Sequence, residues 1–197
     1  MQAAALISGA AIGGFDWLYP VRVVATAAAV WWFGKEYLQI ALPVANWKFA
    51  AGMGAAVGVA WVVMGMRFAP DPGPLAMAGS LSVSGQFVWL FFRAMGALVI
   101  APFAEELAFR GCLMRRIRSL NFEKVSPQIS GWLGFSISSL AFGLLHGPRW
   151  IEGTAAGAVY AYVYMKTGRL GDAILAHAVT NLVVLSVVAV TGNWSYW

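Results

Sequence analysis

The amino-acid sequence predicts an all-α fold, a polytopic transmembrane bundle of about six to seven helices around a polar cavity inside the membrane. The first observation is composition: the 197 residues are 60% hydrophobic and 11% charged, whereas a soluble domain is roughly 25% charged. The second is a mean hydropathy of +0.72. The third is the placement of a few charges inside or next to apolar runs. A chain of this length is expected to form one domain, covering residues 1–197.

About six apolar runs are expected to form the helices, because each approaches the roughly 20 residues that cross the hydrocarbon core. In chain order they are Leu18 to Gly34, Ala50 to Met66, Phe87 to Ala104, Ser130 to Leu145, Ile151 to Met165 and Asp172 to Val190. Before them, Met1 to Gly14 is also apolar and lacks the basic start of a signal peptide, so it could form a seventh helix. In the second run, Gly52, Gly54 and Gly58 are expected to let a neighbouring helix approach closely.

The positive charges indicate which side of the membrane each loop occupies. If the six runs alternate in direction, one side receives more lysines and arginines than the other: Lys35, Lys48, Arg115, Arg116, Arg118, Lys124, Lys166 and Arg169 against Arg22, Arg67 and Arg149. Cytoplasmic loops carry such an excess, so the first group is expected in the cytoplasm. The basic residues that give the formal net charge of +5 would then lie mostly in loops next to the membrane. We expect the chain to contact the lipid bilayer and no nucleic acid.

Three charges lie together at the end of the third run: Glu105, Glu106 and Arg110. On a helix, Glu106 and Arg110 are four residues apart with the acid first, which is the favourable order for an ion pair. Glu105 points about 100° away from Glu106, and no opposite charge lies near it on that helix. An ionisable residue in a membrane segment usually faces a polar cavity and usually has a function. Pro102, just upstream, is expected to kink the helix and help to open such a cavity.

The chain has two histidines, and both lie in membrane-associated segments. His146 ends the run FGLLH, four residues after Phe142, and His177 opens HAVTN, with Asn181 four residues later on the same helical face. A carboxylate, two imidazoles and an amide together are typical of a catalytic site, although each histidine alone is as often a hydrogen-bonded packing group. The sequence contains no HExxH pair and no other familiar zinc spacing. We therefore expect no metal and no cofactor.

These motifs resemble those of a known family. The segments EELAFR (Glu105 to Arg110), FGLLH (Phe142 to His146) and HAVTN (His177 to Asn181) match the EExxxR, FxxxH and HxxxN signatures in order and spacing. These signatures are typical of the CAAX protease and bacteriocin-processing family, the type II CAAX prenyl endopeptidases, also called the Abi family. The flanks DWLYP, from Asp16, and TGNWSYW, at the end of the chain, are similar to a bacterial subgroup associated with exosortase protein-sorting systems. That likeness implies the bacterial inner (cytoplasmic) membrane.

The resemblance implies a glutamate-dependent intramembrane endopeptidase. By position, Glu105 and His146 would activate water, and His177 and Asn181 would stabilise the oxyanion. The supporting residues would be Glu106, Arg110 and Phe142. The substrate would be a membrane-associated protein or peptide, and neither its sequence, nor its prenylation, nor the oligomeric state of the enzyme follows from these motifs. Two alternatives stay open: a zinc-dependent membrane protease, and a non-enzymatic membrane protein such as an immunity factor or scaffold.

Straight helices would keep these residues apart. Glu105 would lie toward the cytoplasmic end of its run and His177 about two turns in from the same side, whereas His146 would fall near the opposite surface. Gly147 and Pro148 break the helix directly after His146. We therefore expect the segment around His146 to end inside the membrane, where irregular backbone borders a polar cavity. Otherwise the boundaries of the predicted runs must be wrong.

Overall fold

The computed structural model describes residues 18–41, 44–73 and 81–197, and within these ranges it contains helices and no strand. This confirms the all-α prediction. The α-helices are α2 (Tyr19–Ala41), α3 (Trp47–Gly65), α5 (Val83–Met95), α6 (Ala101–Glu106), α7 (Met114–Arg116), α8 (Gly131–Leu144), α9 (Trp150–Thr167) and α10 (Leu170–Thr191). Short 3-10 turns cover Phe122–Lys124, Pro127–Ile129, Gly147–Arg149 and Trp194–Tyr196.

The predicted membrane runs all fall in helices, the first in α2 and the last in α10. Among the described residues, 3 helical segments are both long and apolar enough to cross a membrane: Trp47–Gly65, Val83–Arg116 and Leu170–Thr191. The apolar helix α8 has 14 residues, fewer than the roughly 20 that a full crossing needs. The fold is therefore a helix bundle with membrane-spanning helices, as expected. The possible seventh helix, Met1 to Gly14, lies outside the described residues.

One long segment, Val83–Arg116, joins α5, α6 and α7 over 34 residues. Two π-helical stretches, Gly96–Ile100 and Leu107–Leu113, separate these three helices. The first stretch ends where the Ala101 N–H bonds the carbonyl of Gly96, five residues back. It directly precedes Pro102, which has no N–H to continue the α-helical ladder. The irregular turns therefore lie on either side of the two glutamates, and π-turns within α-helices are frequent at functional sites.

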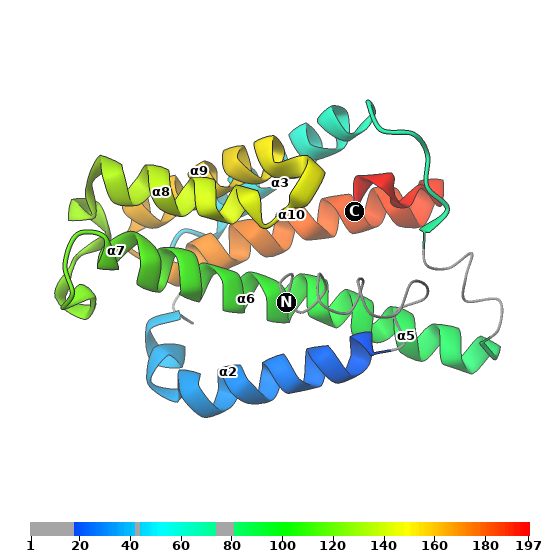
Figure 1. Ribbon diagram of the computed structural model, residues 1–197, viewed down its shortest axis with the longest axis horizontal. Helices are drawn as coiled ribbons and strands as arrows, with labels where there is room; N and C mark the ends of the chain where they lie inside the picture. Colours follow the sequence, from blue (N-terminus) through cyan, green and yellow to red (C-terminus); the bar gives the residue numbers. More distant parts are fainter. Residues whose placement is uncertain (1–17, 42–43, 74–80) are drawn as a thin grey trace.

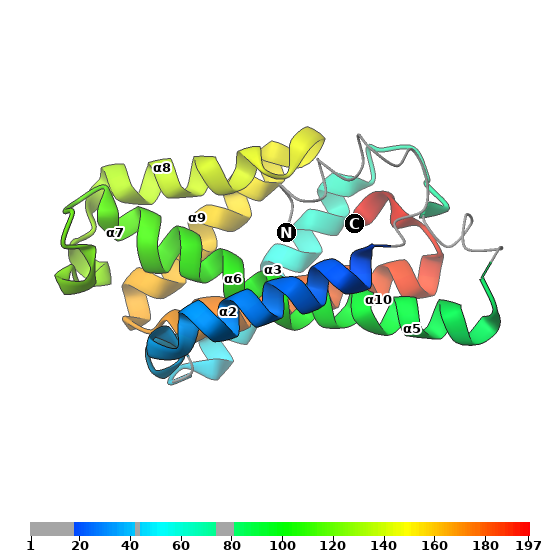
Figure 2. The ribbon, with the colours of Figure 1, turned by 60° about the horizontal axis from the view of Figure 1, so that its bottom comes forward.

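The long segment runs through the length of the molecule, with α8 and α9 on one side of it and α2 on another (Figures 1 and 2). Helices α3 and α10 pack closely against each other. A Cβ at Gly54 would lie 2.2 Å from the carbonyl oxygen of Ala176, and one at Gly58 would lie 2.7 Å from Cβ of Val183. The close approach predicted for Gly54 and Gly58 is confirmed. It is wrong for Gly52, where a Cβ would meet no described atom within 4 Å.

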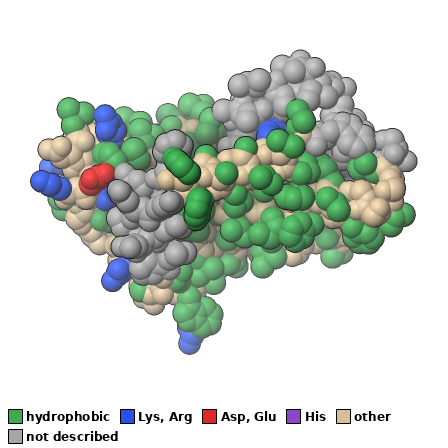
Figure 3. Space-filling view, turned by 90° about the horizontal axis from the view of Figure 1, so that it is seen from below, with side chains coloured by type: hydrophobic (Ala, Val, Ile, Leu, Met, Phe, Trp, Pro, Cys, Tyr) green, Lys and Arg blue, Asp and Glu red, His purple; other side chains and the backbone are tan. Residues whose placement is uncertain are grey.

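The outside of the bundle is apolar. Figure 3 shows one face, on which hydrophobic side chains cover most of the described surface while Lys and Arg gather toward one end. On α5, for example, Phe87 and Phe91 are 69% and 60% exposed. Broad exposed apolar surface of this kind marks a contact with lipid or with another protein. With three helices of spanning length, it identifies an integral membrane protein.

Candidate active site

Glu106 is buried in a network that ties three helices together. Its Oε1 accepts hydrogen bonds from the Arg110 guanidinium, at 2.9 Å, and from Nδ1 of His177, also at 2.9 Å. Arg110 donates in turn to the carbonyl of Gly157 on α9, at 2.7 Å. Glu106 and Arg110 are both 0% exposed. The ion pair predicted from their spacing is therefore confirmed, and His177, on α10, is an additional partner that the spacing did not indicate.

Glu105 has different surroundings. Its side chain is half-buried and lines a cavity of about 350 Å³. Within the described part of the chain, no hydrogen bond or ion pair engages its carboxylate. The two adjacent acids thus differ as the sequence predicted: Glu106 has a counter-charge on its own helix, and Glu105 has none.

His146 lies where the chain leaves α8. The helix ends at Leu144, and Gly147 takes a left-handed conformation with φ of 58° at the start of the short 3-10 turn. The Nδ1 of His146 is 2.8 Å from the carbonyl oxygen of Phe142. Because a carbonyl can only accept, Nδ1 carries the proton and Nε2 keeps a free lone pair. The break expected at Gly147 and Pro148 is present, and it places His146 on the same cavity as Glu105.

The ring of Phe142 joins the two histidines to the buried ion pair. It is 1% exposed. Its centroid lies 4.4 Å from Cζ of Arg110, 4.7 Å from the His146 ring and 5.6 Å from the His177 ring. Phe142 therefore contributes twice to the FxxxH motif: the backbone carbonyl orients His146, and the aromatic ring fills the space between the imidazoles.

His177 is held from two directions. One face of the imidazole stacks on Tyr160 of α9, with centroids 4.8 Å apart and planes inclined by 14°. Its Nδ1 points to Glu106, and since that carboxylate is ion-paired with Arg110 it acts as the acceptor. Nδ1 is then the protonated nitrogen, and Nε2 is left for the cavity, which His177 also lines. Sequence reasoning missed Tyr160, because an aromatic residue in an apolar run looks like ordinary packing.

Asn181 is anchored to the first π-helical stretch. Its Nδ2 donates to the carbonyl of Ala97 at 2.8 Å, and Ala97 lies within Gly96–Ile100. An amide nitrogen has two hydrogens, so one remains for another acceptor. Asn181 lines the cavity together with the two histidines and Glu105.

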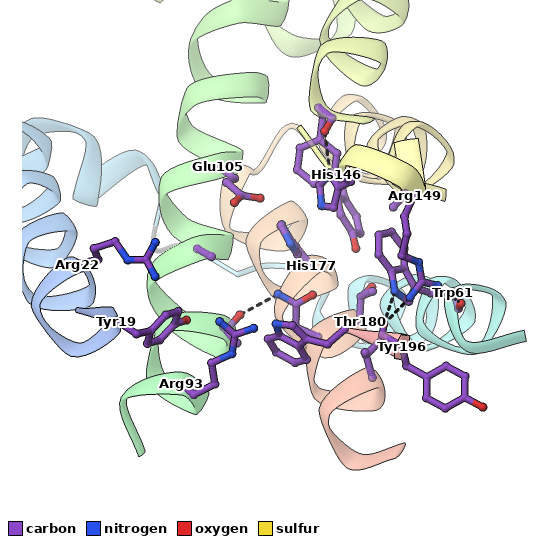
Figure 4. A pocket seen from close by; sticks show the side chains of 18 residues that line it. Tyr19, Arg22, Trp61, Arg93, Glu105, His146, Arg149, His177, Thr180 and Tyr196 are labelled. Carbon is purple, nitrogen blue, oxygen red and sulfur yellow. Dashed lines mark hydrogen bonds between the residues drawn. The ribbon is translucent and has the colours of Figure 1, made fainter. Parts of the chain in front are cut away.

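These four candidates come from three segments that are distant in the chain, and Figure 4 shows Glu105, His146 and His177 around a shared space. The cavity also has a lining that sequence reasoning missed. It includes Trp61, Arg149 and Tyr196, which are bonded to one another: the Trp61 indole N–H donates to the carbonyl of Tyr196 at 2.8 Å, and Arg149 donates to the same carbonyl at 2.6 Å. Among the described residues, no group of three or more His, Cys, Asp or Glu side chains is placed to hold a metal ion.

A comparison with protein families gives a match over about half of the chain. Residues 87–183 match the family model described as type II CAAX prenyl endopeptidase, Rce1-like. The chain belongs to this family. The matched segment contains every site residue predicted from the three motifs, from Glu105 to Asn181. Comparison with curated proteins and with solved structures gives no match.

Membership of the Rce1-like family supports a protease, and thus a hydrolase, acting on a peptide or protein in a membrane context. The apolar helices agree with that setting. The likeness to an exosortase-associated bacterial subgroup, and with it the bacterial inner membrane, stays a prediction.

Proposed function

We propose that this Rce1-like protein is an intramembrane endopeptidase in which Glu105 and His146 activate the attacking water and His177 and Asn181 stabilise the oxyanion. One observation carries the proposal: a carboxylate with no partner among the described residues shares a cavity with two imidazoles and an amide that are each anchored by another group. Anchoring matters because a catalytic side chain must be held in place before the substrate arrives.

The proposed first step uses Glu105 as the general base. Glu105 takes a proton from water while the water oxygen attacks the carbonyl carbon of the peptide bond, and the carbonyl electron pair moves onto its oxygen. His146, with Nδ1 bound to the Phe142 carbonyl, offers Nε2 as an acceptor for the second hydrogen of the same water. In the second step the tetrahedral intermediate collapses, the C–N bond breaks, and the proton held by Glu105 passes to the leaving nitrogen. The products are a carboxylic acid and an amine.

The proposed oxyanion donors are the second amide hydrogen of Asn181 and the ring of His177. Because Nδ1 of His177 is committed to Glu106, the ring can donate into the cavity only when Nε2 is protonated as well. The neutral ring would present a lone pair there instead. Each such donor typically contributes about 3 to 4 kcal/mol to stabilising the transition state.

Glu106, Arg110 and Phe142 are proposed as supporting residues that touch the catalytic side chains without touching the substrate. Glu106 accepts from Nδ1 of His177 and so sets its tautomer, and Arg110 pairs with Glu106 while it donates to the carbonyl of Gly157. Phe142 holds both imidazoles apart at ring-contact distance. Because all three are buried, their loss should disturb the geometry of the site and the stability of the bundle together.

The test uses purified full-length protein in lipid nanodiscs and a mixture of synthetic peptides, with products identified by mass spectrometry. New termini produced by the wild type and not by Glu105→Gln support the proposal. Loss of cleavage to a chelator with recovery on adding zinc would instead favour the zinc-dependent alternative. The non-enzymatic alternative predicts no new termini in the mixture, and none when membrane proteomes of cells with and without the protein are compared.

A further inference from the structure

The catalytic cavity contains a second polar region, which is built around Arg93. Arg93 lies on α5, twelve positions before Glu105 on the same long segment, and both side chains line the cavity. Tyr19 and Arg22 of α2 reach the same region from the neighbouring helix. Figure 4 shows Tyr19, Arg22 and Arg93 along one part of the space, separate from the part bordered by Glu105 and His146.

Aromatic rings, and not carboxylates, surround the Arg93 guanidinium. Its Cζ lies 4.7 Å from the centroid of the Tyr19 ring and 5.0 Å from that of Trp197. Two further rings, Trp89 and Trp194, lie at 5.9 Å and 6.0 Å. Cation–π contacts of this kind stabilise the charge through the ring faces. The Tyr19 hydroxyl is also a hydrogen-bond partner of the guanidinium. The remaining N–H donors can bind a further acceptor, and the buried Nε has no hydrogen-bond partner.

Of the buried arginines in the described residues, Arg110 and Arg149 have acidic partners and Arg115 donates to the backbone carbonyls of Gly111 and Val125, whereas the half-buried Arg93 is surrounded by aromatic rings. Arg110 is paired with Glu106, and Arg149, which lines the same cavity, lies 3.6 Å from a carboxylate oxygen of Glu152. Of the residues that the structure describes, none places a carboxylate within 4.0 Å of Arg93. A guanidinium facing a cavity without an anion is a binding site for one, because planar, paired N–H donors match the geometry of a carboxylate.

We propose that Arg93 binds a carboxylate of the substrate peptide, a role that rests on the endopeptidase function proposed above. Twelve helical positions between Arg93 and Glu105 correspond to about 18 Å along the helix. An extended peptide covers about 3.3 Å per residue, so the carboxylate would lie about three to five residues from the bond that is cut, once the reach of both side chains is allowed for. Either the C-terminus of the peptide or an Asp or Glu side chain can supply it.

A peptide carboxylate fits this region better than the phosphate of a lipid headgroup. The Arg93 region and the proposed catalytic residues line one continuous cavity of about 350 Å³, so a resident lipid headgroup would occupy space that the substrate needs. A peptide that reaches Glu105 and ends at Arg93 fills the same space with one molecule.

The test compares matched peptides against full-length protein in nanodiscs of zwitterionic lipid. Each peptide, about ten residues long, is made with a free C-terminus and as the C-terminal amide. A second series carries Glu or Gln about four residues from the cut. Binding is measured by fluorescence anisotropy on Glu105→Gln protein, and cleavage on protein with Glu105 intact. We expect the carboxylate form of one series to bind and to be cleaved about 10- to 100-fold better than its neutral counterpart.

The variants separate recognition from structure. Arg93→Gln should bring the carboxylate-to-amide ratio close to 1, and Arg93→Lys should retain part of the preference. Arg118→Gln, which removes an exposed arginine from the loop after α7, is the charge-matched control and should change nothing. If Arg93 only packed α2 against α5, its loss would lower melting temperature and all rates together and leave the ratio intact, which overturns the proposal.

The remaining outcomes are also decisive. A preference in the first series identifies the C-terminus as the anion, and one in the second identifies an acidic side chain. Peptides that are cut with no carboxylate preference overturn the Arg93 site and leave the endopeptidase intact. Arg93-dependent binding without any cleavage overturns the endopeptidase function and leaves the Arg93 binding site intact. If a short-chain phosphatidic acid binds through Arg93 and no carboxylate peptide displaces it, the region is a lipid-phosphate site and the proposal is wrong.

Discussion

Two neighbouring carboxylates on α6 have opposite surroundings. Glu106 is fully buried and accepts hydrogen bonds from Arg110 and His177, whereas Glu105 is half-buried, faces the cavity and has no hydrogen bond from the described residues. Nothing but a rotation of about 100° along the helix separates them. In this bundle, the packing of the helix therefore decides which partners each glutamate has. One face of the helix meets α9 and α10, and the other meets the cavity.

The largest effect on activity is expected at Glu105, which faces the cavity. Glu105→Gln keeps the size of the side chain and removes the base, so the cleavage rate should fall by about 10⁴-fold, the upper end for general acid–base catalysis. Because the Glu105 carboxylate has no described partner, the melting temperature should hardly change. Peptide cleavage and thermal unfolding in detergent measure the two quantities. Glu123→Gln, in an exposed loop, is the matched control, and a Glu105→Gln protein with normal turnover would refute the assignment.

The largest effect on stability is expected at Glu106, which is buried against α9 and α10. Glu106→Gln leaves the buried Arg110 charge without its counter-ion, and breaking one partner of such a pair costs about 3–5 kcal/mol. The melting temperature should therefore drop well below that of Glu105→Gln, and activity should fall with it because a neutral amide holds Nδ1–H of His177 less strongly than a carboxylate does. Equal melting temperatures for the two variants would mean that the contrast between the two glutamates has no energetic basis.

Asn181→Ala tests the anchored amide across the cavity. If Asn181 donates to the oxyanion, the maximal rate should fall by about 10²- to 10³-fold with little change in KM. His177→Ala should behave similarly. Ser186→Ala, at an exposed position of the same helix, controls for changes in α10 itself. A variant that keeps its rate but binds peptide more weakly would make Asn181 a docking group.

The smallest effect is expected at Tyr160, the buried residue whose ring stacks on His177. Tyr160→Leu removes the ring that stacks on the imidazole, and such an aromatic pair is worth about 0.5–1.5 kcal/mol. The cleavage rate should fall by about 2- to 10-fold. Tyr162→Leu is the control, since Tyr162 lies on the same helix and is 47% exposed. If both variants lose the same activity, the loss comes from α9 and not from the stack.

Local patterns in the sequence predicted the local features well. The apolar runs located the helices, and the spacing of Glu106 and Arg110 predicted their ion pair, because both depend on residues within one helix. The position of His146 was predictable for the same reason: Gly147 and Pro148 end the helix wherever the rest of the bundle lies. The four candidate catalytic residues from the three motifs line a single cavity in the structure, and their roles stay a prediction.

Contacts between helices could not be predicted in this way. The bond from His177 to Glu106, the stack of His177 on Tyr160 and the aromatic rings around Arg93 each join segments that are distant in the chain. Which faces meet depends on the packing of the whole bundle, and one apolar helix carries little information about its neighbours. Gly52 belongs to the same small-residue pattern as Gly54, but a Cβ there would lie within 4 Å of no described atom. The pattern alone therefore does not tell which glycine faces a neighbouring helix.

The π-helical stretch Gly96–Ile100 has a consequence for the length of the chain. A π-turn corresponds to one residue inserted into an α-helix, so this is a place where the long segment can lose a residue without turning the helix that follows. Deleting Leu98 is expected to restore a regular turn, keep Glu105 toward the cavity and withdraw the carbonyl that holds Asn181. Deleting Phe103 instead would rotate the glutamates by about 100° and bring Glu106 to the place of Glu105. The count of residues before the acidic pair thus selects which carboxylate reaches the substrate.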